Sequence, residues 1–219
     1  MINRRDCIAL TTTLAMAGIS TATVQPQAVD PNNPGETILV LGDSLSAEYG
    51  LRRGTGWVAL LEQRLAAEQI AGKVVNASIS GDTTTGGLAR LPLLLTRHRP
   101  TLVVIELGAN DALRGSPVRL TQDNLTAMTQ AAQKAGAQVL LVGMQVPPNY
   151  GRDYSARFAS VYVAVAQARK TGLVPFMLKG VADVPDSLKW FQADRVHPLE
   201  AAHPIILDNI WPELKKALR

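Results

Sequence analysis

The feature that most constrains the fold is an alternation of two kinds of segment from Thr37 onward. Short apolar segments rich in Val, Ile and Leu alternate with longer segments whose apolar residues recur at helical spacing. The short segments have the length of buried strands, and loops containing Gly, Asn or Pro follow them. Strands separated by helices form βαβ units, which place parallel strands in one sheet with helices on its faces. The pattern therefore predicts a single α/β domain over residues 37–219.

Five strands and the helices between them can be placed on the sequence. Strands are expected over 38–41, 73–77, 101–107, 138–142 and 173–178. Helices are expected over 57–71, 88–98, 120–135 and 154–170. Gly72 would end the first helix, and a C-terminal helix would be broken by Pro204 and Pro212. We find no internal repeat and no linker that would divide this region into two domains.

The first 28 residues have the layout of an export signal. Arg4 and Arg5 precede a weakly apolar, uncharged run over 7–24. A basic pair before a short apolar stretch is typical of such signals, and the paired arginines resemble a twin-arginine signal, with the Sec route left open. We therefore expect an export signal and cleavage region over 1–28, a short lead-in over 29–36, and a periplasmic or secreted protein.

Charge and composition exclude several classes of function. The net charge of +4 comes from dispersed Lys and Arg residues without interleaved aromatics, so no nucleic-acid partner is expected. The only cysteine, Cys7, lies in the expected signal, and the chain has three histidines, so we expect no disulfide, metal or cofactor. No segment has the roughly 20 strongly apolar residues of a membrane span, so we expect no stable membrane anchor. We also expect the protein to be a monomer.

Residues suited to acyl transfer follow the predicted strands. Ser44 follows the first strand, Gly81 the second and Asn110 the third, and Asp194 and His197 lie in the loop after the fifth. The carboxyl ends of parallel strands meet at one edge of the sheet, where ligands bind. Acyl transfer needs a hydroxyl nucleophile, an imidazole base, a carboxylate that orients it, and donors for the oxyanion. The spacing of the last two residues would place both side chains on one face of a helical turn.

Four segments at these positions resemble the four blocks of the GDSL or SGNH hydrolases. They are Gly42-Asp43-Ser44-Leu45, Gly81, Gly108-Ala109-Asn110-Asp111 and Asp194-Arg195-Val196-His197. Longer stretches, 76–84, 106–111, 147–151 and 207–212, resemble the periplasmic branch, which contains arylesterases and the multifunctional thioesterase/lysophospholipase. The resemblance implies a flavodoxin-like three-layer α/β/α sandwich with the strand order 2-1-3-4-5.

The resemblance implies a serine esterase that acts on aryl and short-to-medium acyl esters, acyl thioesters or lysophospholipids. Ser44, His197 and Asp194 would be catalytic, and the Ser44 and Gly81 backbone N–H groups with the Asn110 amide would form the oxyanion hole. Two alternatives stay open: a carbohydrate O-acetylesterase on the same site, and a non-catalytic module that binds phosphate or a nucleotide. Against the second, no Gly-x-Gly-x-x-Gly follows a strand and no P-loop is present.

Two residues depart from that branch, and two aspartates have expected local roles. Arg195 stands where Gly is commoner, and His203 stands where Gln is commoner. His203 is an alternative to His197 as the base. Asp43 is expected to bond local backbone N–H groups and steady the turn of Ser44, and Asp111 is expected to do the same for Asn110.

Overall fold

A computed structural model describes residues 35–146 and 148–218. Its centre is a five-stranded, fully parallel sheet with the order β2-β1-β3-β4-β5. The strands are β1 (Glu36–Gly42), β2 (Gly72–Asn76), β3 (Leu102–Glu106), β4 (Gln138–Val142) and β5 (Gly172–Val174). This order is the one that the family resemblance implies, and the predicted α/β sandwich is confirmed.

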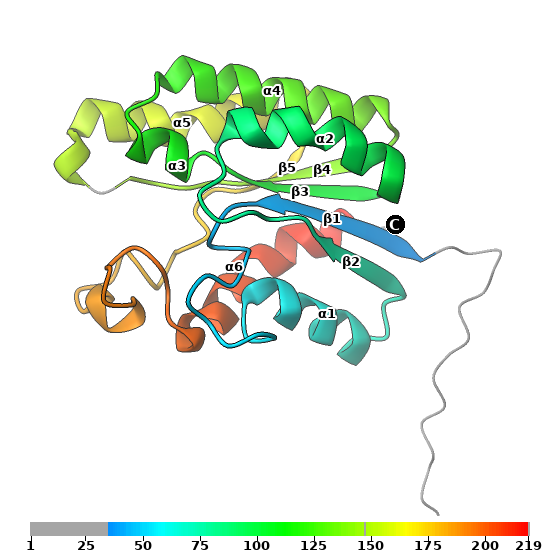
Figure 1. Cartoon of the computed structure of the whole chain (residues 1–219), viewed down its shortest axis with the longest axis horizontal. Coiled ribbons are helices and arrows are strands. Elements are labelled where there is room, and N and C mark those ends of the chain that lie inside the picture. Colours follow the sequence, from blue (N-terminus) through cyan, green and yellow to red (C-terminus); the bar gives the residue numbers. More distant parts are fainter. Residues whose placement is uncertain (1–34, 147, 219) are drawn as a thin grey trace, which may run out of the picture.

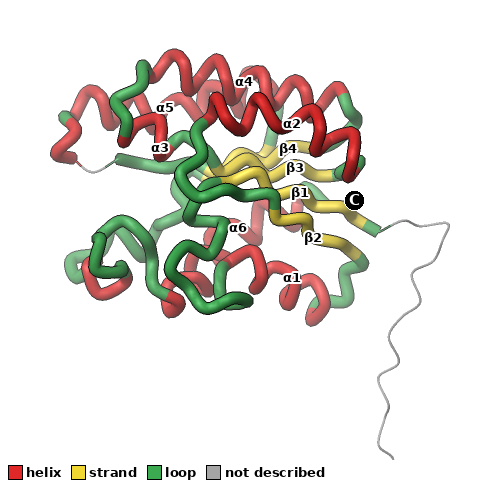
Figure 2. Tube along the Cα trace, viewed as in Figure 1, coloured by secondary structure: helices red, strands yellow, loops and turns green. Residues whose placement is uncertain are grey.

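Helices cover both faces of the sheet, as Figures 1 and 2 show. One face carries α1 (Trp57–Ala67) and α6 (His203–Lys216). The other carries α2 (Thr84–His98), α4 (Val118–Lys134) and α5 (Arg152–Arg169), with the short α3 (Ala109–Leu113) after β3. Because helices bury the sheet on both sides, the central strands are continuous apolar runs, and the side chains from Ile38 to Leu41 are fully buried.

The direction of the strand order reverses between β1 and β3. The chain passes from β1 to β2 on one side, and from β2 to β3 on the other side of β1. The last residues of the two central strands, Gly42 and Glu106, are partners in the sheet register. Ligands of α/β proteins bind at such a reversal. The loops that begin there carry Ser44 and Asn110.

Helix α1 ends earlier than the sequence predicts. The helix stops at Ala67 because Gln69 adopts a left-handed conformation with φ of 57°. The N–H of Ile70 then bonds the carbonyl of Leu65 at 2.9 Å, which closes the helix without a glycine. Gly72, expected to end the helix, is instead the first residue of β2.

Helix α2 begins four residues earlier than expected, at Thr84. The Thr83 hydroxyl accepts a hydrogen bond from the N–H of Gly86 at 3.3 Å and caps the helix. The pair Gly86-Gly87, which reads as a loop in the sequence, therefore lies in the first helical turns. A Cβ at Gly87 would lie 2.3 Å from Cδ1 of Leu107 and would displace that side chain, so glycine allows the helix to pack closely on the strand exit.

Two predictions in the C-terminal half are wrong. The last strand ends at Val174 instead of extending over 173–178, because Pro175 has no N–H to continue the ladder. The C-terminal helix is not broken. Pro204 occupies the first turn of α6, where no intrahelical N–H bond is needed, and Pro212 is accommodated inside a continuous helix.

None of the helices within residues 35–146 and 148–218 is long and apolar enough to cross a bilayer. The export signal expected over 1–28, and the lead-in up to residue 34, lie outside the described residues.

Candidate active site

Three predicted site residues from distant parts of the chain meet at the carboxyl end of β1. His197 Nε2 lies 2.9 Å from Ser44 Oγ, and His197 Nδ1 lies 2.7 Å from Asp194 Oδ2. Ser44 lies in the turn after β1, and the other two lie in the loop between the 3₁₀ helices η2 (Ser187–Trp190) and η3 (Glu200–Ala202). Both distances are hydrogen-bonding distances, in the order hydroxyl, imidazole, carboxylate.

The segment that carries Asp194 and His197 is not the helical turn that the spacing suggests. Arg195 adopts φ of 59°, and Asp194 Oδ1 accepts hydrogen bonds from the N–H groups of Val196 and His197, each at 3.0 Å. The bond from the His197 N–H, followed by that from Val196, lowers the pKa of Asp194 to about 2. The carboxylate is therefore ionised at neutral pH. Glycine, which the family resemblance gives as commoner at position 195, adopts this left-handed φ at a lower steric cost than arginine.

An aromatic ring holds the imidazole from its face. The centroids of the Tyr49 and His197 rings are 4.3 Å apart, with an interplanar angle of 37°. Gln192 Nε2 donates to the carbonyls of Tyr49, at 2.9 Å, and Pro198, at 3.2 Å, and so joins the two loops. Sequence reasoning missed Tyr49, because no pattern around it signals a contact with a residue near the other end of the chain.

The turn that carries Ser44 is organised by Asp43, as expected. Asp43 Oδ1 accepts a hydrogen bond from the N–H of Leu45 at 3.0 Å, and its carbonyl accepts from Ser46 at 3.2 Å and Ala47 at 3.0 Å. Burial raises the pKa of Asp43 to about 6. The turn is thus held by both the side chain and the carbonyl of the residue before the serine.

A buried acid, Glu106, underlies this turn. Its Oε2 accepts hydrogen bonds from Ser46 Oγ at 2.7 Å and from the N–H of Asp43 at 3.3 Å, and Trp57 Nε1 donates to Ser46 Oγ at 3.1 Å. Burial, followed by repulsion from Asp43, raises the pKa of Glu106 well above its usual value, which favours the neutral acid. A Cβ at Gly42 would lie 2.8 Å from Oε2 of Glu106.

Sequence reasoning also missed Glu106. The available signal is a charged residue inside an otherwise apolar strand, since such a residue is buried only with partners.

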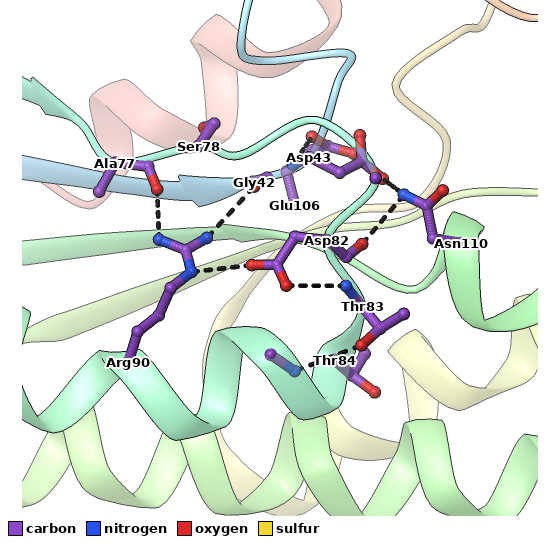
Figure 3. Close-up of polar contacts among 12 residues, drawn as sticks. Gly42, Asp43, Ala77, Ser78, Asp82, Thr83, Thr84, Arg90, Glu106 and Asn110 are labelled. Atoms are coloured by element: carbon purple, nitrogen blue, oxygen red, sulfur yellow. Dashed lines mark hydrogen bonds and ion pairs between the residues drawn. The ribbon is translucent and has the colours of Figure 1, made fainter.

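Asn110 and Gly81, predicted for the oxyanion hole, are joined through Asp82. Asn110 Nδ2 donates to Asp43 Oδ2 at 3.0 Å and to the carbonyl of Asp82 at 2.9 Å (Figure 3). Gly81, the residue before Asp82, has φ of 79°, and its carbonyl accepts from Arg114 Nη2 at 2.7 Å. Asn110 is thus bonded to the turn of the serine and to the loop of Gly81.

Asp111 does not brace Asn110, contrary to expectation. Its Oδ1 accepts from Thr84 Oγ1 at 2.5 Å, and its Oδ2 accepts from the N–H of Thr84 at 2.8 Å. Asn124 Nδ2 also donates to Thr84 Oγ1, at 3.0 Å. The carboxylate therefore bonds the first turn of α2, where a negative charge is favourable, and fixes α3 to α2 and α4.

His203 is not a second base at this site. Its side chain is buried at the start of α6, and its Nδ1 accepts the N–H of Trp57 at 3.0 Å, at the beginning of α1. Burial lowers the pKa of His203 to about 4. The imidazole is therefore neutral at pH 7, and it caps a helix.

This cap makes stability depend on pH. An unfolded histidine binds a proton near pH 6.5, whereas the folded one binds it near pH 4, so the stabilisation present above pH 6.5 is lost as the pH falls toward 4. At about 1.4 kcal/mol per pKa unit, the loss is roughly 3 kcal/mol. His203→Asn keeps an acceptor but cannot ionise, so we expect its free energy of unfolding to fall less between pH 7.5 and 4.5.

Denaturant unfolding of both proteins at the two pH values measures this difference. The comparison is needed because the raised pKa values of Asp43 and Glu106 act in the opposite direction in both proteins. Equal losses in the wild type and the variant would contradict the assigned role of His203.

A surface hollow lies elsewhere, between α4 and α5, and includes Tyr154 and Arg157, but none of the five predicted site residues lines it. Within residues 35–146 and 148–218, no three His, Cys, Asp or Glu side chains are grouped so that they could hold a metal ion. The candidate site is therefore the group of polar residues at the carboxyl ends of β1 and β3, to which the loop of Asp194 and His197 contributes.

A parallel sheet of this order, with serine, imidazole and carboxylate meeting at its carboxyl edge, is typical of SGNH-type hydrolases. The model of the GDSL-like lipase/acylhydrolase family matches residues 40–205. The chain belongs to this family, which confirms the resemblance seen in the sequence.

Three curated relatives are similar over most of the chain. Esterase TesA of Pseudomonas aeruginosa is 56% identical over 183 residues, which are 84% of this chain and 90% of the relative. Arylesterase of Vibrio mimicus is 44% identical over 183 residues, again 84% and 90% of the two chains. Thioesterase 1/protease 1/lysophospholipase L1 of Escherichia coli K12 is 42% identical over 180 residues, 82% of this chain and 84% of the relative.

Solved structures show the same fold. The crystal structure of TesA, 56% identical, has a TM-score of 0.80 and matches 84% of this chain and 100% of that chain. The psychrotrophic esterase EstA from Pseudoalteromonas, inhibited by monoethylphosphonate, is 44% identical with a TM-score of 0.77, over 83% of this chain and 97% of that chain.

Proposed function

We propose that this SGNH-family esterase is an exported serine hydrolase in which Ser44, His197 and Asp194 form the catalytic triad. The family and the close relatives, named esterase, arylesterase and thioesterase, make the chain a hydrolase of acyl esters. The observation that carries the residue assignment is the continuous chain of two hydrogen bonds from Ser44 through His197 to Asp194.

In the acylation step, His197 Nε2 takes the proton of the Ser44 hydroxyl while Oγ bonds the acyl carbon. Asp194, ionised at neutral pH, accepts the Nδ1–H and stabilises the imidazolium. Backbone N–H groups of Ser44 and Gly81 and the Asn110 amide stabilise the oxyanion. His197 then gives the proton to the departing alcohol or thiol, and the acyl-oxygen or acyl-sulfur bond breaks.

In the deacylation step, water replaces the alcohol or thiol. His197 takes a proton from the water as its oxygen bonds the acyl carbon, and then returns a proton to Ser44 Oγ as the acid leaves. Tyr49 lies against the imidazole throughout, and its ring face favours the transient positive charge.

The relatives' names support acyl esters, acyl thioesters and lysophospholipids as the substrate classes. That the protein acts as a monomer is part of the proposal. The phosphonate-inhibited EstA supports a nucleophilic mechanism, since phosphonates mimic the tetrahedral intermediate. Membership of a hydrolase family argues against the non-catalytic phosphate- or nucleotide-binding module.

A graded substrate panel tests this function. The mature protein should hydrolyse p-nitrophenyl esters from acetate to dodecanoate, and also acyl-CoAs and lysophosphatidylcholine. Ser44→Ala serves as the background control. Turnover of acetylated xylo-oligosaccharides alone, with no aryl ester or thioester hydrolysis, would instead support the carbohydrate O-acetylesterase alternative.

Export is part of the proposal, and its route is testable. The twin-arginine pathway reads the arginine pair itself, so Arg4→Lys together with Arg5→Lys should retain the esterase in the cytoplasm of a bacterial host. Fractionation with an activity assay, with the unaltered chain as control, measures this. Undiminished activity in the periplasm would indicate the Sec route.

A further inference from the structure

Arg90 bonds the end of β1 and two residues of the loop between β2 and α2, at the carboxyl edge of the sheet. It lies on α2, and its Nε donates to Asp82 Oδ2 at 2.8 Å. Its Nη1 donates to the carbonyl of Ala77 and its Nη2 to the carbonyl of Gly42 at 3.4 Å, as Figure 3 shows. The side chain is 20% exposed and that of Asp82 is 11% exposed, so the ion pair is largely shielded from water.

Each of these three residues is connected to one proposed oxyanion donor. Gly42 is the last residue of β1, two positions before Ser44. Ala77 begins the loop that ends in Gly81. Asp82 follows Gly81, and its carbonyl accepts the hydrogen bond from the Asn110 amide at 2.9 Å. One guanidinium therefore bonds the segments that carry Ser44 and Gly81, and it is linked to Asn110 through Asp82.

The side chain of Asp82 is held on both carboxylate oxygens, so it can connect Arg90 rigidly to the loop of Gly81. While Oδ2 bonds Arg90, Oδ1 accepts the N–H of Thr83 at 2.9 Å. A Cβ at Gly86 would lie 1.9 Å from Oδ1, so the first turn of α2 packs directly on the carboxylate. The loop around Gly81, whose φ is 79°, is thereby attached to the helix rather than left to its own backbone preferences.

We propose that Arg90 is a positioning residue for the oxyanion hole, which acts through Asp82 and the ends of β1 and β2 without touching the substrate. The inference rests on the proposed function of Ser44, Gly81 and Asn110. Arginine is required because its planar fork offers several N–H donors in fixed directions, whereas lysine offers one compact ammonium group.

The test compares Arg90→Lys, Arg90→Ala and the matched control Arg97→Ala, an exposed arginine on the same helix. Misplaced donors weaken transition-state stabilisation more than substrate binding. We therefore expect kcat to fall by roughly 10² for Arg90→Ala and at least ~10-fold for Arg90→Lys, with little change in KM. The control should keep the wild-type kcat.

Chemical rescue separates positioning from general destabilisation. Guanidinium at about 20 mM, far below denaturing concentrations, should raise kcat of Arg90→Ala but not that of the wild type or of Arg97→Ala. Wild-type kcat in Arg90→Lys, or a loss in Arg90→Ala that guanidinium does not relieve, would overturn the inference. An active Ser44→Ala enzyme would overturn the proposed function itself, so the two failures are distinguishable.

Discussion

Replacing Ser44 by alanine is expected to lower kcat by about 10⁴-fold or more, because a triad loses most of its rate when its nucleophile is removed. The substitution deletes one hydroxyl from a turn whose other bonds come from Asp43, so the fold should persist. Steady-state kinetics on p-nitrophenyl butyrate, with circular dichroism and thermal unfolding to verify the fold, measures the effect.

Ser160→Ala provides the control, because this serine is exposed on α5 and bonds only within its own helix. It should retain full activity. A folded Ser44→Ala enzyme that keeps more than about a tenth of wild-type turnover would show that Ser44 is not the nucleophile.

Replacing Asn110 by alanine is expected to lower kcat by roughly 10²–10³-fold, about 2.7–4 kcal/mol, with little change in KM. Hydrogen bonds to Asp43 and Asp82 hold the amide in place, and one of them must be exchanged for the bond to the oxyanion. Because the donor gains strength only as negative charge develops, its loss should act on the transition state.

Asn110→Asp distinguishes this role from that of a turn former. Aspartate serves turns as well as asparagine, so a purely local role predicts a mild effect. In the oxyanion role, the new carboxylate would repel the developing charge and would also face Asp43 Oδ2 and the carbonyl of Asp82. We expect it to be at least as damaging as alanine, and an active Asn110→Asp enzyme would refute the assignment.

The sheet could be predicted because its signals are local. A buried parallel strand such as β1 is a short apolar run, and the residue types after β1 and β3 show which chemistry the loops can support. The order of the strands came from the family resemblance, since periodicity alone does not determine which strands are neighbours.

The sequence predictions fail where the local structure depends on an unusual backbone angle or on a contact with a residue distant in the sequence. Helix α1 ends where Gln69 adopts a left-handed φ, which nothing in the sequence around this glutamine predicts. Arg195 also adopts a left-handed φ and forms a tight turn, although the spacing of Asp194 and His197 suggested a helical turn. The residues that support the site, Glu106, Asp82 and Arg90, have partners on other elements, and no spacing rule connects an arginine on α2 with the ends of β1 and β2.

Mapping the adduct of a fluorophosphonate tests the proposed triad most directly. The account predicts one adduct per chain, on Ser44, and labelling slowed by orders of magnitude in His197→Ala, because the imidazole activates the hydroxyl. Intact mass and peptide sequencing locate the adduct, and time courses give the rate. An adduct on another residue, or a His197→Ala protein labelled as fast as the wild type, would contradict the account.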